Sequence, residues 1–344
     1  MACEVSLTYE RRAKAPAAIA AQLQTPRSLA LSNPRLLPWL LMRPSALVAA
    51  LLMLPALSHA QSLVGRSDSI YTWRGVMPAS ALLTIRNFNG PIDVRPAEGS
   101  TAEVRAEKRT SRDGGVIGDV AFDIQQGAGG DVTFCSTLRN NNPCDDRRYD
   151  SRDDDRDTWR RNVTVAMTVL LPRGTRLKVV TGNGAVSVER VGGDVQASTG
   201  NGRVRVDGTE GAVRVSTGNG DVEVRGARSS VRVSTGNGRV NVTTTEGPVE
   251  ARTGNGDIDV MMTQLKARDD MTFSSGSGTV RVTLPAGYNG ELDASTGNGE
   301  LRSDFDLRIQ GRMNPRRVRA TIGEGGPKLR LTTGNGRLEI RKGA

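Results

Sequence analysis

The chain has 344 residues and a formal net charge of +10, and only 3% of its residues are aromatic. Its single histidine, His59, lies in a segment that we expect to be removed, which excludes histidine-based catalysis and histidine metal sites in the remainder. Because the first 60 residues hold six basic and two acidic residues, the charge falls to +6 without them. This mild surplus, with both signs interspersed, argues against a nucleic-acid-binding protein.

Residues 1–60 are predicted to be an upstream extension followed by a signal peptide. From Met42 the chain has a basic residue, an apolar stretch over 46–57 and a small-x-small cleavage site that ends at Ala60. This apolar stretch is too short to span a bilayer, which takes about 20 apolar residues. We therefore interpret Met42 as the true start and expect a periplasmic, cell-surface or secreted protein. An uncleaved signal that tethers the chain to the membrane is the alternative.

Residues 61–175 are predicted to form an elaborate N-terminal β cap, which solenoids need at the end of the stack. Asn87-Phe-Asn-Gly90 and the residues after it look like an early, degenerate copy of the repeat described below. Alternation of apolar and polar residues marks further strand-like stretches. These stretches lie at 101–109, 118–126, 130–136 and 162–171.

Two cysteines remain in this predicted cap. Cys135 and Cys144 are expected to form a disulfide that closes a ten-residue loop in an oxidising compartment. Closing such a loop stabilises the fold by about 2–3 kcal/mol in the chain-entropy model. Two free thiols are the alternative. Their spacing is not the C-x-x-C of redox enzymes, so we do not expect redox catalysis.

An acidic and arginine-rich segment at 145–157 follows the second cysteine. Residues Asp153 to Asp157 begin like an EF-hand calcium loop, but Thr158 and Thr164 stand where that loop requires glycine and glutamate. We therefore interpret the segment as a solvated excursion and do not predict a calcium site there.

Residues 176–344 contain a repeat with a period of eighteen residues. A fixed short period is typical of a solenoid, in which one structural unit is stacked many times. The motif Thr-Gly-Asn-Gly begins at 181, 199, 217, 235 and 253, and further copies follow at wider spacing, a degenerate one at 275 and two more at 296 and 333.

Each repeat divides into two halves, and each half has a glycine-rich corner and a short alternating stretch. Val204 and Val206 mark one stretch, and Val213 and Val215 mark the next. Alternating β-branched residues between glycine turns are a strand signature. Two strands with one apolar side each can bury it only against each other and against neighbouring coils. We therefore predict an all-β fold: a parallel β-solenoid with two short strands per coil of about 18 residues.

The motif asparagines are expected to lie above one another at one corner, where their amides can form hydrogen bonds along the stack. The flanking glycines permit corner dihedrals that other residues avoid. Charges that alternate along Arg203, Asp221, Arg239 and Asp257 also favour in-register stacking. The predicted corner ladder comprises Asn183, Asn201, Asn219, Asn237, Asn255, Asn298 and Asn335.

The C-terminal end is predicted to contain a coil with an excursion over 303–320 and then a final turn, Leu329 to Lys342. An open last coil would favour end-to-end self-association, because it presents unpaired strand edges. Arg341 and Lys342 are the alternative, since charged residues can protect such an edge.

Ligand sites known from other glycine-rich repeats do not fit this motif. A phosphate loop requires a helix after the glycines, and no helical pattern follows any copy. Calcium-binding solenoids need aspartate two residues after Gly-x-Gly, where this chain has Val186, Val204, Val222, Val240 and Ile258. We therefore predict neither a cofactor nor a metal.

The chain resembles the bacterial putative-adhesin family of β-strand repeats over about residues 80–344. The resemblance rests on the Thr-Gly-Asn-Gly copies, on the Leu-Pro-x-Gly segments that end at Gly174 and Gly287, and on Ile322 to Leu331 before the last copy. It implies an exported or membrane-anchored β-solenoid and brings no catalytic residues. The segment at 145–157 is not expected in that family.

We therefore predict a non-enzymatic scaffold or interaction surface of the cell envelope. Its expected partner is an envelope protein or an anionic envelope polymer, and no nucleic acid. A polysaccharide-active or glycan-binding β-helix is the alternative, which the scarcity of aromatic residues and the charge ladders disfavour.

Overall fold

A computed structural model describes residues 64–110, 116–138, 162–266, 268–311, 314 and 316–343. The predicted signal segment, Cys144 and the segment 145–157 lie outside these residues. The regular structure of the described part consists of strands and two short 3-10 turns, η1 (Ile117–Asp119) and η2 (Ala128–Gly130). No helix of this part is long and apolar enough to span a bilayer. The all-β prediction is confirmed.

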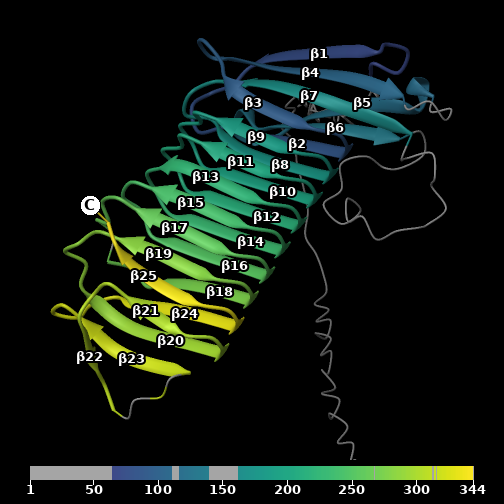
Figure 1. The fold of residues 1–344 in the computed structure, drawn as a ribbon. Coiled ribbons are helices and arrows are strands. Elements are labelled where there is room, and N and C mark those ends of the chain that lie inside the picture. The colour runs from purple at the N-terminus through teal and green to yellow at the C-terminus, as the bar shows by residue number, and fades with distance from the viewer. Residues whose placement is uncertain are drawn as a thin grey trace, which may run out of the picture. The chain divides into compact units, whose positions relative to one another are not determined.

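The strands of the described residues form two long sheets, and in Figure 1 the strands of each sheet follow one another along a common axis. In spatial order, the 13-stranded sheet contains β22 (Leu307–Ile309), β23 (Arg317–Ile322), β20 (Gly290–Asn298), β24 (Lys328–Asn335), β18 (Met271–Ser277), β16 (Val249–Asn255), β14 (Val231–Asn237), β12 (Val213–Asn219), β10 (Val195–Asn201), β8 (Arg176–Asn183), β2 (Leu82–Asn89), β6 (Val132–Leu138) and β5 (Val120–Gln126).

The second sheet runs alongside and has twelve strands within the described residues. Its order is β1 (Ile70–Val76), β4 (Thr101–Thr110), β7 (Val163–Leu171), β3 (Ile92–Pro96), β9 (Val186–Glu189), β11 (Val204–Asp207), β13 (Val222–Ala227), β15 (Val240–Thr244), β17 (Ile258–Met262), β19 (Val280–Leu284), β25 (Leu338–Lys342) and β21 (Leu301–Ser303).

Successive coils stack in parallel with identical residues above one another. Val213 pairs with Val195 on one side and with Val231 on the other, and Val222 pairs likewise with Val204 and Val240. These side chains are at most 2% exposed and belong to one continuous apolar core between the sheets. Since alternate residues of a strand point to opposite faces, the repeat buries the same valines in every coil.

The last glycine of each motif copy makes close stacking possible. Gly220 has φ of +149°, and a Cβ there would lie 2.1 Å from the carbonyl oxygen of Gly202 in the neighbouring coil. Any side chain would therefore push two coils apart at this corner.

The N-terminal strands cover the stack with antiparallel pairs. β4 pairs antiparallel with β7 and with the edge strand β1, and β5 pairs antiparallel with β6. The strand-like stretches expected in this part correspond to β4, β5, β6 and β7. β2 and β3 form an additional coil between the cap and the coil of β8 and β9, and its Asn89 pairs with Asn183 of β8.

An aromatic cluster fills the cap around a buried lysine. The rings of Tyr71 and Phe134 both pack on Phe122, each with ring centres 5.3 Å apart. Lys108 is 3% exposed, and its Nζ donates to the carbonyl oxygens of Gly65 and Val120 at 2.5 and 2.6 Å, respectively. Burial lowers the pKa of Lys108. The lysine thus joins the segment before β1 to β5.

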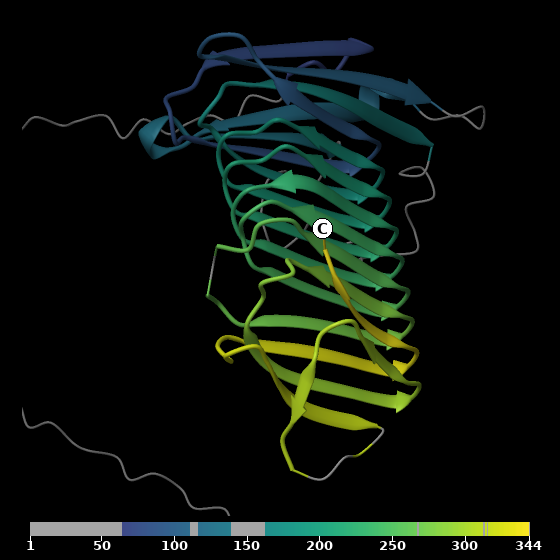
Figure 2. The same ribbon diagram turned by 60° about the vertical axis from the view of Figure 1, so that its left-hand side comes forward.

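At the C-terminal end the coils are not in sequence order. The predicted final turn, Leu329 to Lys342, does form a coil, but its predicted place at the end of the stack is wrong. β24 and β25, yellow in Figures 1 and 2, lie between the coil of β18 and β19 and the coil of β20 and β21. Residues 303–320 do not form a coil, because β22 and β23 make an antiparallel extension beside β20. Arg341 and Lys342 therefore belong to an internal strand and do not protect an edge.

The charges explain this order. In sequence order, Arg281 of β19 would lie beside Arg302 of β21. The inserted strand instead places Glu339 between the two arginines, so the series Asp259, Arg281, Glu339 and Arg302 alternates in sign. Opposite charges on neighbouring strands stabilise a sheet, whereas like charges destabilise it.

Tyr288, in the segment that crosses from β19 to β20, provides a test of this end of the stack. It is 8% exposed, and within the described residues its hydroxyl has no hydrogen-bond partner. Burial, reinforced by Asp270, raises the pKa of Tyr288 to about 12. Because the unfolded phenol ionises near 10, stability is expected to fall as pH rises from 10 through about 12.

Tyr288→Phe is expected to remove this alkaline loss, which is about 2–3 kcal/mol at the upper end of the window. Below pH 10 the variant should match the wild type within about 1 kcal/mol, because the lost hydroxyl makes no bond. Denaturant unfolding of both proteins across this pH range measures the difference. An identical pH dependence in the two proteins would contradict the assignment.

Candidate interaction surface

The outer face of the 13-stranded sheet carries a groove of about 570 Å³ that crosses five coils. A row of smaller residues forms one side of it, among them Ala212, Ser230 and Pro248. Long polar side chains form the other side, one from each of β8, β10, β12, β14 and β16. This second row, which we call the groove row, consists of Lys178, Gln196, Arg214, Arg232 and Glu250.

The strand register builds this groove directly from the repeat. Members of the groove row pair with one another from coil to coil, so they are spaced at the distance between parallel strands, about 4.8 Å. Each of them follows a buried valine or leucine and therefore points outward. An extended ligand that lies along the stack would meet the same chemical position in coil after coil.

The charge of the groove changes along its length. Over β8 to β14 the lining is basic on balance, because four cations outnumber one carboxylate there, and the other end is acidic. The cations are Arg176, Lys178, Arg214 and Arg232, the carboxylate is Asp194, and the acidic end holds Glu250, Asp269 and Asp270. Arg232 forms an ion pair with Glu250 at 2.6 Å. Arg214 is exposed and has no ion-pair partner within the described part of the chain. An anionic group could therefore bind Arg214 without breaking an existing ion pair.

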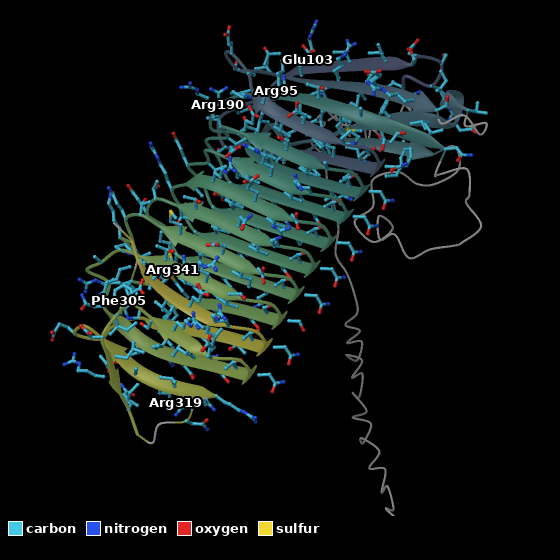
Figure 3. All side chains as sticks on the ribbon, viewed as in Figure 1. Arg95, Glu103, Arg190, Phe305, Arg319 and Arg341 are labelled. Carbon is cyan, nitrogen blue, oxygen red and sulfur yellow. The ribbon has the colours of Figure 1, made fainter. Side chains whose placement is uncertain are left out.

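The outer face of the 12-stranded sheet is organised differently, because its charges satisfy one another. Arg205 contacts Asp207 at 2.7 Å and Glu223 at 3.5 Å, and Arg281 donates to Asp259 and Glu339, both at 2.9 Å. The hydrogen bond from Arg281 lowers the pKa of Glu339 and correspondingly raises the pKa of Arg281. This face is better explained as a stabilising ion-pair ladder than as a ligand site. Figure 3 marks Arg341 on the same sheet.

The corner asparagines lie above one another as a hydrogen-bonded ladder. In each step, Nδ2 of one asparagine donates to Oδ1 of the neighbour: Asn201 to Asn183 and Asn237 to Asn219 at 2.7 Å, and Asn219 to Asn201 and Asn255 to Asn237 at 2.8 Å. Ser277 interrupts the series. Beyond it, Asn298 donates to Asn335 at 2.8 Å, in the inserted order.

A second ladder, formed by threonines, was not predicted from the sequence. The buried threonine that begins each motif donates from Oγ1 to the last motif glycine of the neighbouring coil, as Thr199 does to Gly184 at 3.1 Å and Thr217 to Gly202 at 3.2 Å. The sequence feature that could have indicated this ladder is the recurrence of threonine or serine at a position that faces the core, where an apolar residue such as valine is expected. The hydroxyl satisfies a corner carbonyl that the turn leaves without a strand partner.

The remaining site predictions are only partly covered by the described residues. Cys135 is buried on β6, and Cys144 lies outside the described residues, so their disulfide stays a prediction. The segment that carries Thr158 also lies outside them. The described residues contain no cluster of three or more potential metal ligands. No site for a cofactor was predicted.

Comparison with known proteins places the chain in a family. A search of curated proteins found no match. Two solved structures are similar. One is a putative cell adhesion protein from Clostridium sporogenes ATCC 15579, with 9% identity and a TM-score of 0.28, and the match covers 80% of this chain and 100% of that chain. The other is a putative adhesin from Bacteroides fragilis NCTC 9343, with 11% identity and a TM-score of 0.36, and the match covers 81% of this chain and 99% of that chain. The model of the Toastrack DUF4097 family matches residues 158–341. More than half of the chain thus matches, the predicted resemblance is confirmed, and the chain belongs to the Toastrack DUF4097 family.

Proposed function

We propose that this protein is an exported, non-enzymatic, adhesin-like scaffold whose groove binds an extended anionic polymer of the cell envelope. The observation that carries the proposal is the groove across five coils, with a basic row over β8 to β14. A polymer along the axis can place an anionic group beside Arg214 and others beside Lys178 and Arg232, of which Arg232 already forms an ion pair with Glu250. Such complementarity contributes to recognition and to the association rate. The names of the two similar structures, both associated with adhesion, agree with this role.

The two-stranded coil of about 18 residues suits a scaffold of this kind. It repeats one surface position at a constant spacing, and the ion pairs of the 12-stranded sheet and the asparagine corner hold the coils in register. Self-association through the stack ends is less well supported, because antiparallel strands extend both ends of the 13-stranded sheet. An envelope protein as the ligand is a possible result of the experiment below.

Arg214→Glu is expected to weaken binding of alginate, a polyuronate, at least about fivefold at low salt, because it puts a negative charge into the basic row. The matched control is Arg239→Glu, which makes the same charge change at an exposed corner outside the groove. Binding is measured by titration calorimetry, with neutral dextran as the second ligand.

The two variants separate site binding from general charge attraction. Equal weakening by Arg214→Glu and Arg239→Glu would mean that alginate responds only to the net charge. If dextran binds with an affinity that changes neither with the two substitutions nor with salt concentration, the glycan-binding alternative is favoured. If neither polymer binds and an envelope protein is retained in an Arg214-dependent manner, the groove has a protein ligand.

A further inference from the structure

Asn-Gly dipeptides can modify themselves chemically, and this chain contains nine of them. The backbone nitrogen of glycine attacks Cγ of the asparagine, a new C–N bond closes a succinimide, and the Cγ–Nδ2 bond breaks to release ammonia. Water then opens the ring to give aspartate or isoaspartate. Glycine lacks the Cβ that hinders the attack after other residues. The reaction requires a glycine nitrogen that is free to lose its proton and to approach Cγ.

In the stacked corners, the glycine nitrogen is held by the neighbouring coil. The N–H of Gly184 donates to the carbonyl oxygen of Asn201 at 2.8 Å, and the same bond recurs along the stack at 2.6 to 2.9 Å. The donors of this series are the glycines of six Asn-Gly steps: Gly90, Gly184, Gly202, Gly220, Gly238 and Gly336. Each of these steps can react only after the coils separate locally.

The corner at Asn298 is the exception, because its coil is the last one in the stack. Strand β23 lies next to β20, but it is antiparallel, and the last backbone bond on this side is from the N–H of Thr296 to the carbonyl oxygen of Arg316 at 2.9 Å, before the corner. Within the described residues, the nitrogen of Gly299 has no hydrogen-bond acceptor. Gly299 is also exposed, whereas the glycines that follow the other asparagines of the corner ladder are half-buried. The insertion of the C-terminal coil therefore decides which corner is left open.

The remaining two Asn-Gly steps serve as internal controls. At Asn255, the ladder is interrupted by Ser277 and Oδ1 has no donor in the described part, but the nitrogen of Gly256 still donates to Ser277 at 2.8 Å. At Asn289, Oδ1 accepts a hydrogen bond from the nitrogen of Glu324 at 2.8 Å, and Gly290 is buried. Asn255 and Asn298 thus both donate through Nδ2, and within the described residues neither Oδ1 accepts a hydrogen bond, but only at Asn298 is the backbone bond of the following glycine missing as well.

We propose that Asn298-Gly299 is a site of spontaneous deamidation in the folded protein, and that stacking protects the other Asn-Gly steps. The product loses the Nδ2 donor that binds Asn335 at 2.8 Å. Isoaspartate also lengthens the backbone at the residue whose carbonyl oxygen accepts the N–H of Gly336. The modification would therefore act on the contact between the last coil and the inserted C-terminal coil.

The test is incubation of the folded protein in mildly alkaline buffer, followed by tryptic digestion and mass spectrometry of every Asn-Gly peptide. Asn298 and Asn289 lie in one tryptic peptide, Val282–Arg302, and fragmentation distinguishes them. Asn298 is expected to deamidate at least about tenfold faster than Asn201, Asn219 or Asn237, because those corners react only from a locally opened state. In denaturant, the nine steps should react at similar rates.

Two results would overturn the proposal. One is a folded-state rate at Asn298 no higher than at Asn219. The other is a rate at Asn255 equal to that at Asn298, which would assign protection to the side-chain ladder and not to the glycine nitrogen. Asn298→Gln, which keeps an amide at the corner but forms a succinimide-type ring far less readily, should remove the fast component while leaving thermal unfolding close to that of the wild type.

Discussion

Val222→Asp is expected to unfold several coils together and to lower the free energy of unfolding by at least about 4 kcal/mol at neutral pH. Val222 is 1% exposed and pairs with Val204 and Val240, so a carboxylate there enters three adjoining apolar layers. Nearest-neighbour coupling in a solenoid carries the damage to coils on both sides. Thermal unfolding followed by circular dichroism measures the loss, which should be smaller in acid, where the carboxyl group is neutral.

Ser234→Asp is the matched control, because it introduces the same charge on the outer face of the neighbouring coil. Ser234 is exposed and pairs with Ser216 and Arg252, so its substitution should change stability by no more than about 0.5 kcal/mol. Near-normal stability of Val222→Asp, or equal losses in both variants, would contradict the assignment of Val222 to the core.

The regular part of the fold could be predicted because one physical constraint repeats. Every eighteen residues the chain presents the same apolar positions and the same glycine corner, and only in-register stacking buries all of them. The same constraint predicted the asparagine corner. The groove could not be recognised in this way, since it depends on small residues such as Ala212 and Ser230, which vary between repeats and lie outside the motif.

The order of the last two coils was predicted wrongly because the repeat does not distinguish them. Both contain Thr-Gly-Asn-Gly and the same apolar alternation, so either fits on β18 and β19. The distinguishing features lie on the surface and beyond the motif. Glu339 separates Arg281 from Arg302. The ring of Phe305 packs against Tyr288, with ring centres 6.5 Å apart, and Nζ of Lys342 lies 5.3 Å from the centre of the Phe305 ring. The charge series contained this information, since only the inserted order alternates in sign.

Truncation after Gly326 is expected to leave the coils before Leu284 folded and to release residues 285–326. It removes β24 and β25, which pair on one side with β18 and β19 and on the other with β20 and β21. Four side chains that are at most 1% exposed are lost, Leu329, Leu331, Leu338 and Ile340. The burial of each side chain stabilises the folded state by about 1.5–3 kcal/mol, so we expect the last coils to unfold without them. Limited proteolysis should therefore yield a fragment that ends near Leu284.

Cleavage at an engineered protease site in the glycine-rich segment 323–327 is the control, because it cuts the same connection while the coil stays in place. The cleaved protein should keep residues 290–322 protected, and a peptide of residues 327–343 should restore protection to the truncated chain. Protection of 290–322 in the truncated chain without the peptide would mean that β20 and β21 had moved onto β18 and β19. In that case the inserted coil would not be required to close the stack, because the repeat alone would provide an equivalent surface for the preceding coil.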